Sequence, residues 1–166
     1  MTMHNTVICP GSFDPVTLGH IDIITRASRM FDHVIVGVFV NAEKHPVFSI
    51  EERVDFLKRT VGDLPNVEVT SCDGLLAQCA RDLGASAVVR GLRAVSDFEY
   101  EFQMALTNRK LNPDLDTVFL ASDASYTYLS SSIVKNVGYH GGDISNFVPA
   151  CIHDEIFKRI NRKGNR

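Results

Sequence analysis

The sequence has no tryptophan and only four cysteines, Cys9, Cys72, Cys79 and Cys151. No two of these cysteines form a C-x-x-C pair, and no histidine cluster lies beside them at the spacing of a zinc site. We therefore expect free thiols in a reducing, cytoplasmic environment and no structural metal centre.

Charge of one sign and long apolar runs are also scarce. The formal net charge of the 166 residues is -3, which disfavours non-specific binding to nucleic acid or to a membrane surface, because both rely on basic patches. No apolar run approaches the length of a membrane span, and residues 1–7 lack the apolar core of a signal peptide. We expect neither nucleic acid nor membrane as a partner, so any anion-binding site must be local.

The length fits one domain, and we expect a single domain over residues 1–166. Short apolar stretches predict strands at residues 6–9, 34–40, 67–70, 87–89 and 117–120. Helical patterns lie between and after them, at residues 21–31, 49–61, 75–83, 96–109, 130–137 and 152–160. This strict alternation predicts an α/β fold, a doubly wound, Rossmann-like, five-stranded parallel sheet with helices on both faces.

Local signals place several helix starts. Ser49 with Glu52, and Ser96 with Glu99, have the spacing of a capping box. Residues 75–76, a pair of leucines after the third strand, are expected in the core.

The turn after the first strand, residues 10–20, reads PGSFDPVTLGH. It is neither a G-x-G-x-x-G fingerprint nor a Walker A loop, which disfavours a hydride-transfer enzyme and a P-loop ATPase. Gly11 and Gly19 permit close approach of a ligand, and Ser12 offers a hydroxyl group. His20 is expected on the first turn of a helix whose N-terminus attracts anions, where it either contacts a phosphate or simply packs and caps the helix.

Residues 17–20 (TLGH) match the [T/H]-x-G-H motif of the nucleotidyltransferase superfamily. With the preceding Pro-Gly-Ser-Phe-Asp-Pro, the segment resembles the bacterial phosphopantetheine adenylyltransferases. Residues 90–101 (RGLRAVSDFEYE) are similar to the same family, and residues 129–135 (LSSSIVK) resemble the superfamily signature I-S-S-[S/T]-x-x-[K/R]. Leu129 replaces the usual isoleucine and Ser12 replaces the usual threonine. The resemblance runs from about residue 7 to residue 157.

The resemblance implies reversible transfer of the adenylyl group from ATP to 4′-phosphopantetheine, which gives 3′-dephospho-coenzyme A and pyrophosphate. The acceptor phosphate is already a nucleophile, so in-line attack needs no covalent enzyme intermediate. His20 is then expected to stabilise the transition state, with Lys44 and Arg93 as further catalytic residues. Mg²⁺ bridged by the phosphates, without protein ligands, is the implied cofactor. A homohexamer and feedback binding of coenzyme A are implied as well.

The resemblance also assigns binding residues, which come from the carboxyl ends of several predicted strands. The phosphopantetheine side comprises Ser12, Lys44, Leu76, Arg90 and Asn108. The ATP side comprises Ser12, Phe13, His20, Gly91, Leu92, Arg93, Glu101, Tyr126, Thr127, Tyr128, Leu129, Ser130, Ser131 and Ser132.

Plainer interpretations exist for the charged and hydroxyl residues among them. Lys44 could be an ordinary loop lysine, the two arginines could pair with Asp97 or Glu99, and Glu101 could be an exposed helix glutamate. The serines at 130–132 could simply cap a helix, which needs only one of them.

Two other functions stay open on the sequence alone. One is an adenylyl- or cytidylyltransferase of the same superfamily that acts on nicotinamide mononucleotide or a phospho-alcohol. The other is a non-catalytic nucleotide-binding domain, which would need the phosphate-binding groups but not a histidine at the α-phosphate. A class I aminoacyl-tRNA synthetase core shares the histidine signature, but 166 residues leave no room for tRNA-binding domains.

Overall fold

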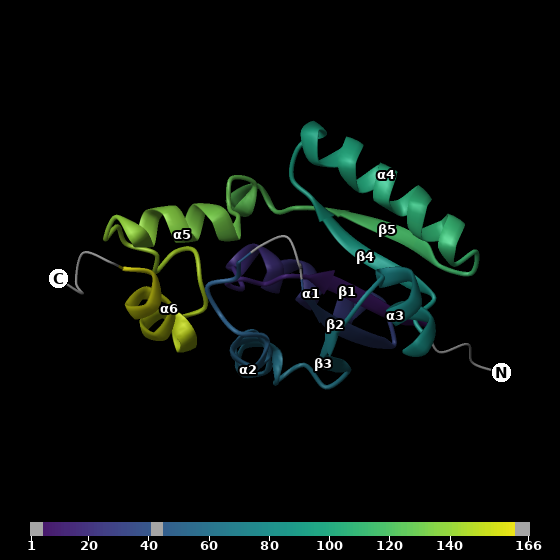
Figure 1. Ribbon diagram of the computed structural model, residues 1–166, viewed down its shortest axis with the longest axis horizontal. Helices are drawn as coiled ribbons and strands as arrows, with labels where there is room; N and C mark the ends of the chain where they lie inside the picture. Colours follow the sequence, from purple (N-terminus) through teal and green to yellow (C-terminus); the bar gives the residue numbers. More distant parts are fainter. Residues whose placement is uncertain (1–4, 41–44, 162–166) are drawn as a thin grey trace.

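Five parallel strands form the single sheet of the computed structural model, which describes residues 5–40 and 45–161, apart from the side chains of Val95 and Ser96. They are β1 (Thr6–Gly11), β2 (His33–Phe39), β3 (Val67–Cys72), β4 (Ala87–Leu92) and β5 (Asp116–Ala121). The order across the sheet is β3-β2-β1-β4-β5 (Figure 1). The chain therefore winds outward from β1 in one direction and then from β4 in the other, which confirms the doubly wound fold.

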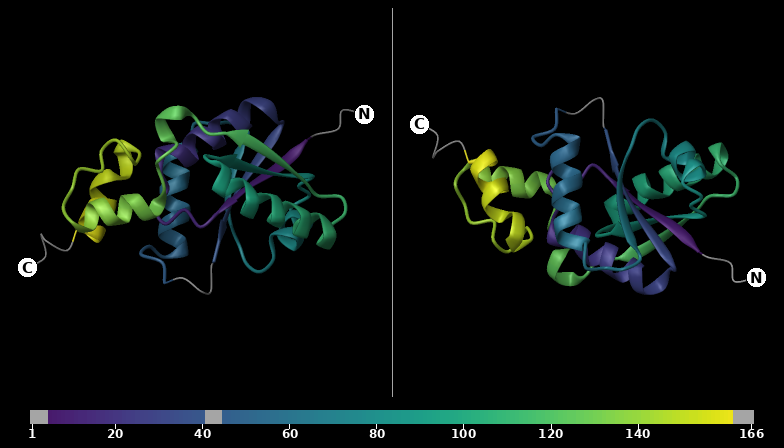
Figure 2. Two further views of the ribbon diagram at one scale, coloured as in Figure 1. Left: turned by 90° about the horizontal axis from the view of Figure 1, so that it is seen from above. Right: turned by 90° about the horizontal axis from the view of Figure 1, so that it is seen from below.

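Helices cover both faces of the sheet. They are α1 (Leu18–Met30), α2 (Ile50–Val61), α3 (Leu76–Asp82), α4 (Val95–Leu111), α5 (Ser131–Tyr139) and α6 (His153–Ile160), with short 3-10 turns at η1 (Ala124–Tyr126) and η2 (Ala150–Ile152). Helices α1 and α2 lie on one face and α3 and α4 on the other (Figure 2). Helices α5 and α6 pack together at one end of the molecule (Figure 1). Within the described ranges, no helix has both the length and the apolar character that crossing a membrane requires.

The two faces of β1 belong to two separate cores. Val7 and Cys9 point into the larger core, which α1, α2, α5 and α6 complete. Ile8 points to the opposite face, where it packs with Ala77 and Ala80 of α3. Because successive side chains of a strand alternate between faces, a strand covered on both sides must be apolar throughout. This explains the continuous apolar run of β2.

Of the two capping boxes predicted from the sequence, one is present at a helix start and the other is not. The Ser49–Glu52 capping box is present at the start of α2. The expected Ser96–Glu99 box is wrong, because α4 already begins at Val95, after an N-cap residue, Ala94, that makes no side-chain cap bond. The reason is local. The carboxylate of Asp97 accepts a hydrogen bond from the backbone N–H of Arg93 (3.3 Å), which starts the helix earlier.

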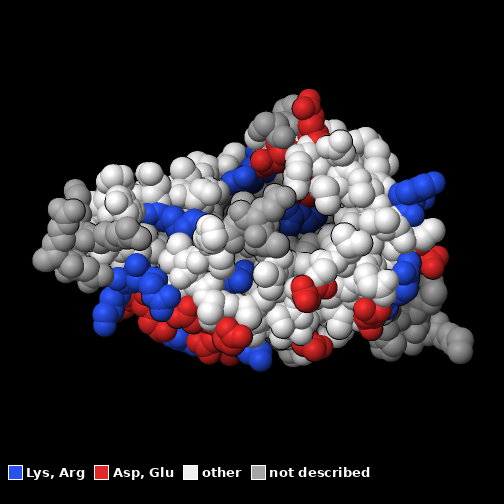
Figure 3. All heavy atoms as spheres, in the orientation of Figure 1, with Lys and Arg blue, Asp and Glu red and all other residues white. Residues whose placement is uncertain are grey.

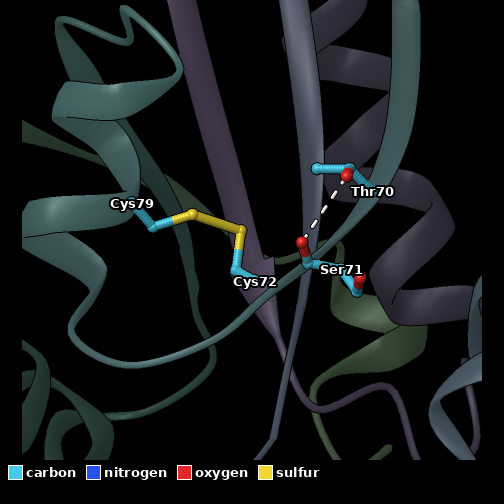
Figure 4. The surroundings of a disulfide bond; sticks show 4 residues. All are labelled: Thr70, Ser71, Cys72 and Cys79. Atoms are coloured by element: carbon cyan, nitrogen blue, oxygen red, sulfur yellow. Dashed lines mark hydrogen bonds between the residues drawn. A yellow bond between two sulfur atoms is a disulfide. The ribbon is translucent and has the colours of Figure 1, made fainter.

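The cysteines also depart from expectation. Cys72 and Cys79 form a disulfide bond (Figure 4), whereas Cys9 and Cys151 are free. The prediction of four free thiols is therefore wrong for Cys72, at the end of β3, and Cys79, in α3. Gly74, at a φ of 80°, turns the chain back so that α3 lies beside the end of β3, and the two Cα atoms come within 6.3 Å. The same turn leaves Leu75 exposed as the N-cap residue of α3, so its expected place in the core is wrong as well.

Candidate active site

Two cavities lie side by side at the carboxyl ends of β1 and β4. The first has a volume of about 400 Å³ and the second about 230 Å³, which together fall in the range of small-molecule sites. Arg90 and Glu101 line both cavities, so the two share a wall. Figure 3 shows basic side chains recessed in the middle of this face of the molecule. This shared edge is where parallel α/β sheets bind their ligands.

Most of the predicted site residues lie around these cavities. The first cavity is lined by Phe13, His20, Arg90, Gly91, Arg93, Glu101, Tyr126, Leu129, Ser130 and Ser131. The second is lined by Ser12, Leu76, Arg90, Glu101 and Asn108. Of the remaining predicted residues, Leu92, Thr127 and Tyr128 line neither cavity, Ser132 lines a smaller one, and Lys44 lies outside the described residues.

His20 caps the start of α1 and also lines the first cavity. It is the third residue of α1, and its Nδ1 accepts a hydrogen bond from the backbone N–H of the N-cap residue Thr17 (3.0 Å). Since Nδ1 is an acceptor, the neutral imidazole must carry its proton on Nε2. The cap therefore fixes the tautomer and leaves an N–H donor on a side chain that lines the first cavity.

The surroundings of His20 keep it neutral. Burial lowers its pKa to about 4, and the positive charges of Arg90 and Arg93 act in the same direction. The ring of Phe13 packs edge-on against the imidazole, with 5.0 Å between ring centroids. Without an anion, this side chain is thus an uncharged donor that lies near two arginines.

Arg90 is held on both sides by fixed acceptors. Its Nε and Nη2 donate to the two carboxylate oxygens of Glu101 (2.9 and 2.5 Å), and its Nη1 donates to the carbonyl of Pro10 (2.8 Å). Desolvation acts to lower the pKa of Arg90, but its bonds and charge interaction with Glu101 outweigh this, so the pKa is raised overall. A bidentate pair of this kind fixes the plane of the guanidinium group. Glu101 is therefore not the ordinary exposed helix glutamate that was one alternative.

Arg93 connects the end of β4 with the segment before α5. Its Nη1 donates to the carbonyl of Leu129 (2.8 Å), while its Nε pairs with Asp97 (3.1 Å). The ion pair with Asp97 was one of the plainer interpretations, and it is present. It coexists with a place in the wall of the first cavity, so the pairing orients Arg93 without removing it from the site.

Two serines at the start of α5, Ser130 and Ser131, make different hydrogen bonds. Ser130 is the N-cap residue and accepts from the backbone N–H of Ile133 (3.2 Å). Ser131 donates to the carbonyl of Pro15 in the first turn (2.8 Å). Capping thus uses one serine, and the second ties the helix to the β1–α1 turn.

Gly91, in β4, is required because α1 packs closely against it. A Cβ atom at this position would lie 2.9 Å from Cγ1 of Ile23 in α1. Only glycine lets α1 approach β4 closely enough to place His20 beside Arg90.

Asp14 is a residue of the site that the motif analysis overlooked. It is buried, and its carboxylate accepts from the backbone N–H groups of Val47 (3.0 Å) and Phe48 (2.9 Å) while lying 3.4 Å from the ammonium of Lys135. It therefore binds the β1–α1 turn to the segment that enters α2 and to α5. The signal was a single carboxylate between Phe13 and Pro15 in this turn, because a carboxylate needs partners when it is buried.

Arg53 also stabilises the β1–α1 turn, through hydrogen bonds to backbone carbonyls. Its buried side chain donates from Nη1 to the carbonyls of Ser12 (2.8 Å) and Phe39 (3.2 Å), and from Nε to that of Phe48 (3.1 Å). These carbonyls come from the ends of β1 and β2 and from the start of α2. Arg53 thus holds three segments in one arrangement, and its position inside an ordinary helix gave no sequence signal.

Carboxylates near the cavities are already engaged. Asp97 and Glu101 each pair with an arginine, and Asp14 is surrounded by N–H donors. In the part of the chain that the structure describes, no three His, Cys, Asp or Glu side chains are grouped as metal ligands.

His20 should titrate far from its ordinary range. We predict that in the ligand-free protein its ring protonates near pH 4, whereas histidines of the unfolded chain titrate at about 6.5. Because the unfolded state takes up this proton first, the free energy of unfolding should fall as the pH drops from about 6.5 to about 4. NMR titration of the imidazole measures the pKa directly, and protonation at about pH 6.5 would contradict the arrangement.

Asp14 should matter for stability as well as position. We predict that Asp14→Ala lowers the free energy of unfolding by about 3 kcal/mol, because two backbone N–H groups lose their acceptor. Asp14→Asn retains one acceptor oxygen and should lose less. Asp55→Ala, which removes an exposed partner of Arg59, is the matched control and should cost less than about 0.5 kcal/mol. Equal losses for Asp14→Ala and Asp55→Ala in urea denaturation would contradict this role.

Known proteins resemble this chain over nearly its whole length. The sequence profile of the family described as Cytidylyltransferase-like matches residues 8–137. A phosphopantetheine adenylyltransferase of Caldanaerobacter subterraneus is 53% identical over 155 residues, which cover 93% of this chain and 97% of the relative. One from Clostridium tetani is 53% identical over 159 residues, covering 96% and 99%.

Similarity of fold extends to more distant proteins. The structure of Plasmodium falciparum nicotinic acid mononucleotide adenylyltransferase complexed with NaAD superimposes with a TM-score of 0.70 at 14% identity, covering 94% of this chain and 96% of that one. At this identity the likeness concerns the fold alone. The close relatives decide the family: the chain belongs to the phosphopantetheine adenylyltransferases.

Proposed function

We propose that this chain transfers the adenylyl group of ATP to the phosphate of 4′-phosphopantetheine, giving 3′-dephospho-coenzyme A and pyrophosphate. The curated relatives, at more than half identity over nearly the whole chain, support this activity. The observation that carries the proposal is the pair of cavities divided by Arg90 and Glu101. Two substrates that react with each other need adjoining sites with a charged group at the junction.

The first cavity suits ATP. Its wall includes the N-terminal turns of α1 and α5, whose free N–H groups and dipoles favour phosphates. Arg93 and the serines at 130 and 131 add donors for the β- and γ-phosphates. The smaller cavity beside them, lined by Ser132 and Lys135, extends this polar seat.

The second cavity suits the pantetheine arm. Phe39, Leu76 and Met104 give it apolar walls, and Asn108 adds an amide group at its side. The arm has the same character, since it is an apolar chain interrupted by amide groups. Its phosphate would lie toward Arg90, which lines both cavities.

Catalysis then depends on position and charge. The acceptor phosphate attacks the α-phosphorus in line and pyrophosphate leaves, so no covalent enzyme intermediate forms. The Nε2–H of His20 donates to the α-phosphoryl oxygens as charge accumulates on them. Arg90 is already oriented by Glu101 and the Pro10 carbonyl, so little reorganisation is needed when the substrates meet. Lys44 is proposed to bind the acceptor phosphate, and Arg93 the leaving group.

Mg²⁺ is the proposed cofactor, and it would offset the negative charge of the nucleotide. The carboxylates near the cavities fit this assignment, because each is already paired with an arginine or with N–H donors. Chelation of Mg²⁺ should therefore abolish turnover while leaving the fold intact.

Other acceptors are less well supported. A nicotinamide mononucleotide or phospho-alcohol acceptor would not call for an apolar second cavity, and the close relatives carry the phosphopantetheine name. A non-catalytic nucleotide-binding domain would not require a histidine whose tautomer is fixed by its own helix cap.

We further propose self-association, with a homohexamer as the expected assembly. Support comes from α4, where Phe98, Phe102 and Leu106 recur every four residues along one side of the helix and are all exposed in the single chain. Isolated proteins rarely leave such a row of large apolar groups open. Cytoplasmic location and feedback binding of coenzyme A at the acceptor cavity complete the proposal. Competition between coenzyme A and phosphopantetheine in a binding assay tests the latter.

Removal of the imidazole should affect rate more than binding. We expect His20→Ala to lower kcat by at least about 100-fold, as for other transition-state donors, while the Kd of ATP in calorimetry changes little. The substitution also removes a helix cap, so Ser49→Ala, which removes the capping serine of α2, is the control. It should lose about 1 kcal/mol of stability and retain its kcat. Near-normal turnover of His20→Ala would remove His20 from the mechanism.

Lys44→Ala should weaken the binding of the acceptor phosphopantetheine and leave the binding of ATP unchanged. Loss of one charged hydrogen bond to a phosphate predicts a rise of about 10- to 100-fold in the Kd of phosphopantetheine. Lys58→Ala changes an exposed lysine of α2 and should have no effect. Calorimetry that shows unchanged acceptor affinity in Lys44→Ala would contradict the assignment.

The assembly can be tested on α4. We predict that Phe102→Glu places a charge inside the subunit contact and shifts the protein to smaller species in sedimentation velocity. Met30→Glu makes the same change at an exposed apolar residue of α1 and should leave the assembly intact. An unchanged sedimentation coefficient for Phe102→Glu would show that this face of α4 is not the contact.

A further inference from the structure

The disulfide between Cys72 and Cys79 joins the end of β3 to α3 (Figure 4). Cys72 is the last residue of β3 and pairs in register with Phe39 of β2. Cys79 lies in α3, one turn after Leu76. Phe39 and Leu76 line the second cavity and pack against the core that contains Cys72. The bond therefore ties α3, which bears Leu76, to β3, the strand that pairs with the one bearing Phe39.

The turn between β3 and α3 has few other supports. Helix α3 is only seven residues long, and its N-cap residue Leu75 makes no side-chain cap bond. The residues at 73–75 are exposed, and Gly74 takes a positive φ. A short, uncapped helix after an exposed glycine turn is weakly held by its own backbone.

Side chains around α3 add little to this. The buried side chains of α3 itself are small, Ala77 and Ala80, so the helix buries limited apolar area against the larger residues of this core. The amide of Asn112 holds the carbonyl of Ala77 (3.2 Å), and Arg81 reaches the carbonyl of Leu111 (3.2 Å). Both contacts fix α3 to the end of α4, and the disulfide is the link that fixes it to β3.

The two cysteine residues differ in exposure. Cys72 is only 3% exposed, whereas Cys79 is partly exposed. A thiolate from solution can therefore reach Sγ of Cys79 and displace Cys72. Cys9 offers no such chemistry, because burial raises its pKa to about 12, and Cys151 is exposed but has no partner cysteine.

We propose that Cys72 and Cys79 form a thiol–disulfide exchange site for small dithiols and disulfides, and that closure of the bond positions Leu76 at the wall of the acceptor cavity. In the reductive direction, a thiolate of the dithiol attacks Cys79, and Cys72 leaves with the bonding electron pair and takes up a proton. The second thiolate of the reagent then displaces Cys79, which is protonated in turn. The protein gains two thiols and the dithiol becomes a cyclic disulfide. A small disulfide reverses the exchange.

Reduction of the bond should change the affinity for the acceptor but not for ATP, and this expectation rests on the proposed function of the second cavity. No residue of α3 lines the first cavity, so the affinity for ATP should not depend on the bond. If the reduced turn occupies the position seen here about one-fifth of the time, acceptor affinity falls about fivefold.

The experiment compares one protein in two redox states. The full-length chain is oxidised with glutathione disulfide or reduced with a phosphine, and its thiols are counted by alkylation in denaturant. Amide hydrogen exchange is measured over residues 73–79, and calorimetry uses ATP and S-methyl-4′-phosphopantetheine, whose blocked thiol cannot react with the disulfide. Cys72→Ala with Cys79→Ala should reproduce the reduced state, and Cys151→Ser, which changes the exposed free thiol, is the matched control.

We expect two alkylated cysteines in the oxidised protein and four in the reduced one. Reduction should accelerate exchange at residues 73–79 and weaken the S-methyl acceptor about fivefold, with ATP affinity unchanged and Cys151→Ser behaving like the parent. Four reactive thiols after oxidation, or equal rates of amide hydrogen exchange at residues 73–79 in the oxidised and reduced proteins, would overturn the proposal. If the S-methyl acceptor binds to neither the oxidised nor the reduced protein, the substrate assignment is contradicted. Amide hydrogen exchange over residues 73–79 would still decide the role of the disulfide.

Discussion

The Arg90 guanidinium occupies the point where the two cavities meet, and most of the site is arranged around it. Glu101 fixes its plane, the carbonyl of Pro10 fixes its direction, and its charge contributes to the low pKa of His20. The Arg90 side chain is 34% exposed, and the N–H groups on its enclosed side need these partners, since leaving them unpaired would be costly. Glu101 thus acts through Arg90, and its position on α4 makes that helix part of the active site although much of its surface is exposed.

The fold follows from patterns that the sequence displays directly. The all-apolar run of β2 requires cover on both faces, which in turn requires helices between parallel strands. Because the carboxyl ends of parallel strands share one edge, the order of strands and helices along the chain predicts that the segments around His20, Arg90 and Ser130 lie together. The structure confirms that all three residues line a single cavity.

The pairings within the site were not predictable in the same way. Asp14 bonds to backbone groups more than thirty residues away, and Arg53 bonds only to carbonyls, which carry no residue identity. The disulfide was missed because its seven-residue separation fits no familiar cysteine motif. The helix start at Val95 was missed because Asp97 bonds back to Arg93, a local competition that the capping-box pattern does not reveal.

The central claim is that adjoining cavities bring ATP and phosphopantetheine together for direct adenylyl transfer. Pyrophosphate release from ATP, measured with 4′-phosphopantetheine, nicotinamide mononucleotide and phosphocholine as acceptors, tests it most directly. We predict rapid release with 4′-phosphopantetheine, formation of an equal amount of 3′-dephospho-coenzyme A, and little release with the other two. Release with another acceptor but not with 4′-phosphopantetheine, or none with any acceptor although ATP binds, would contradict the account.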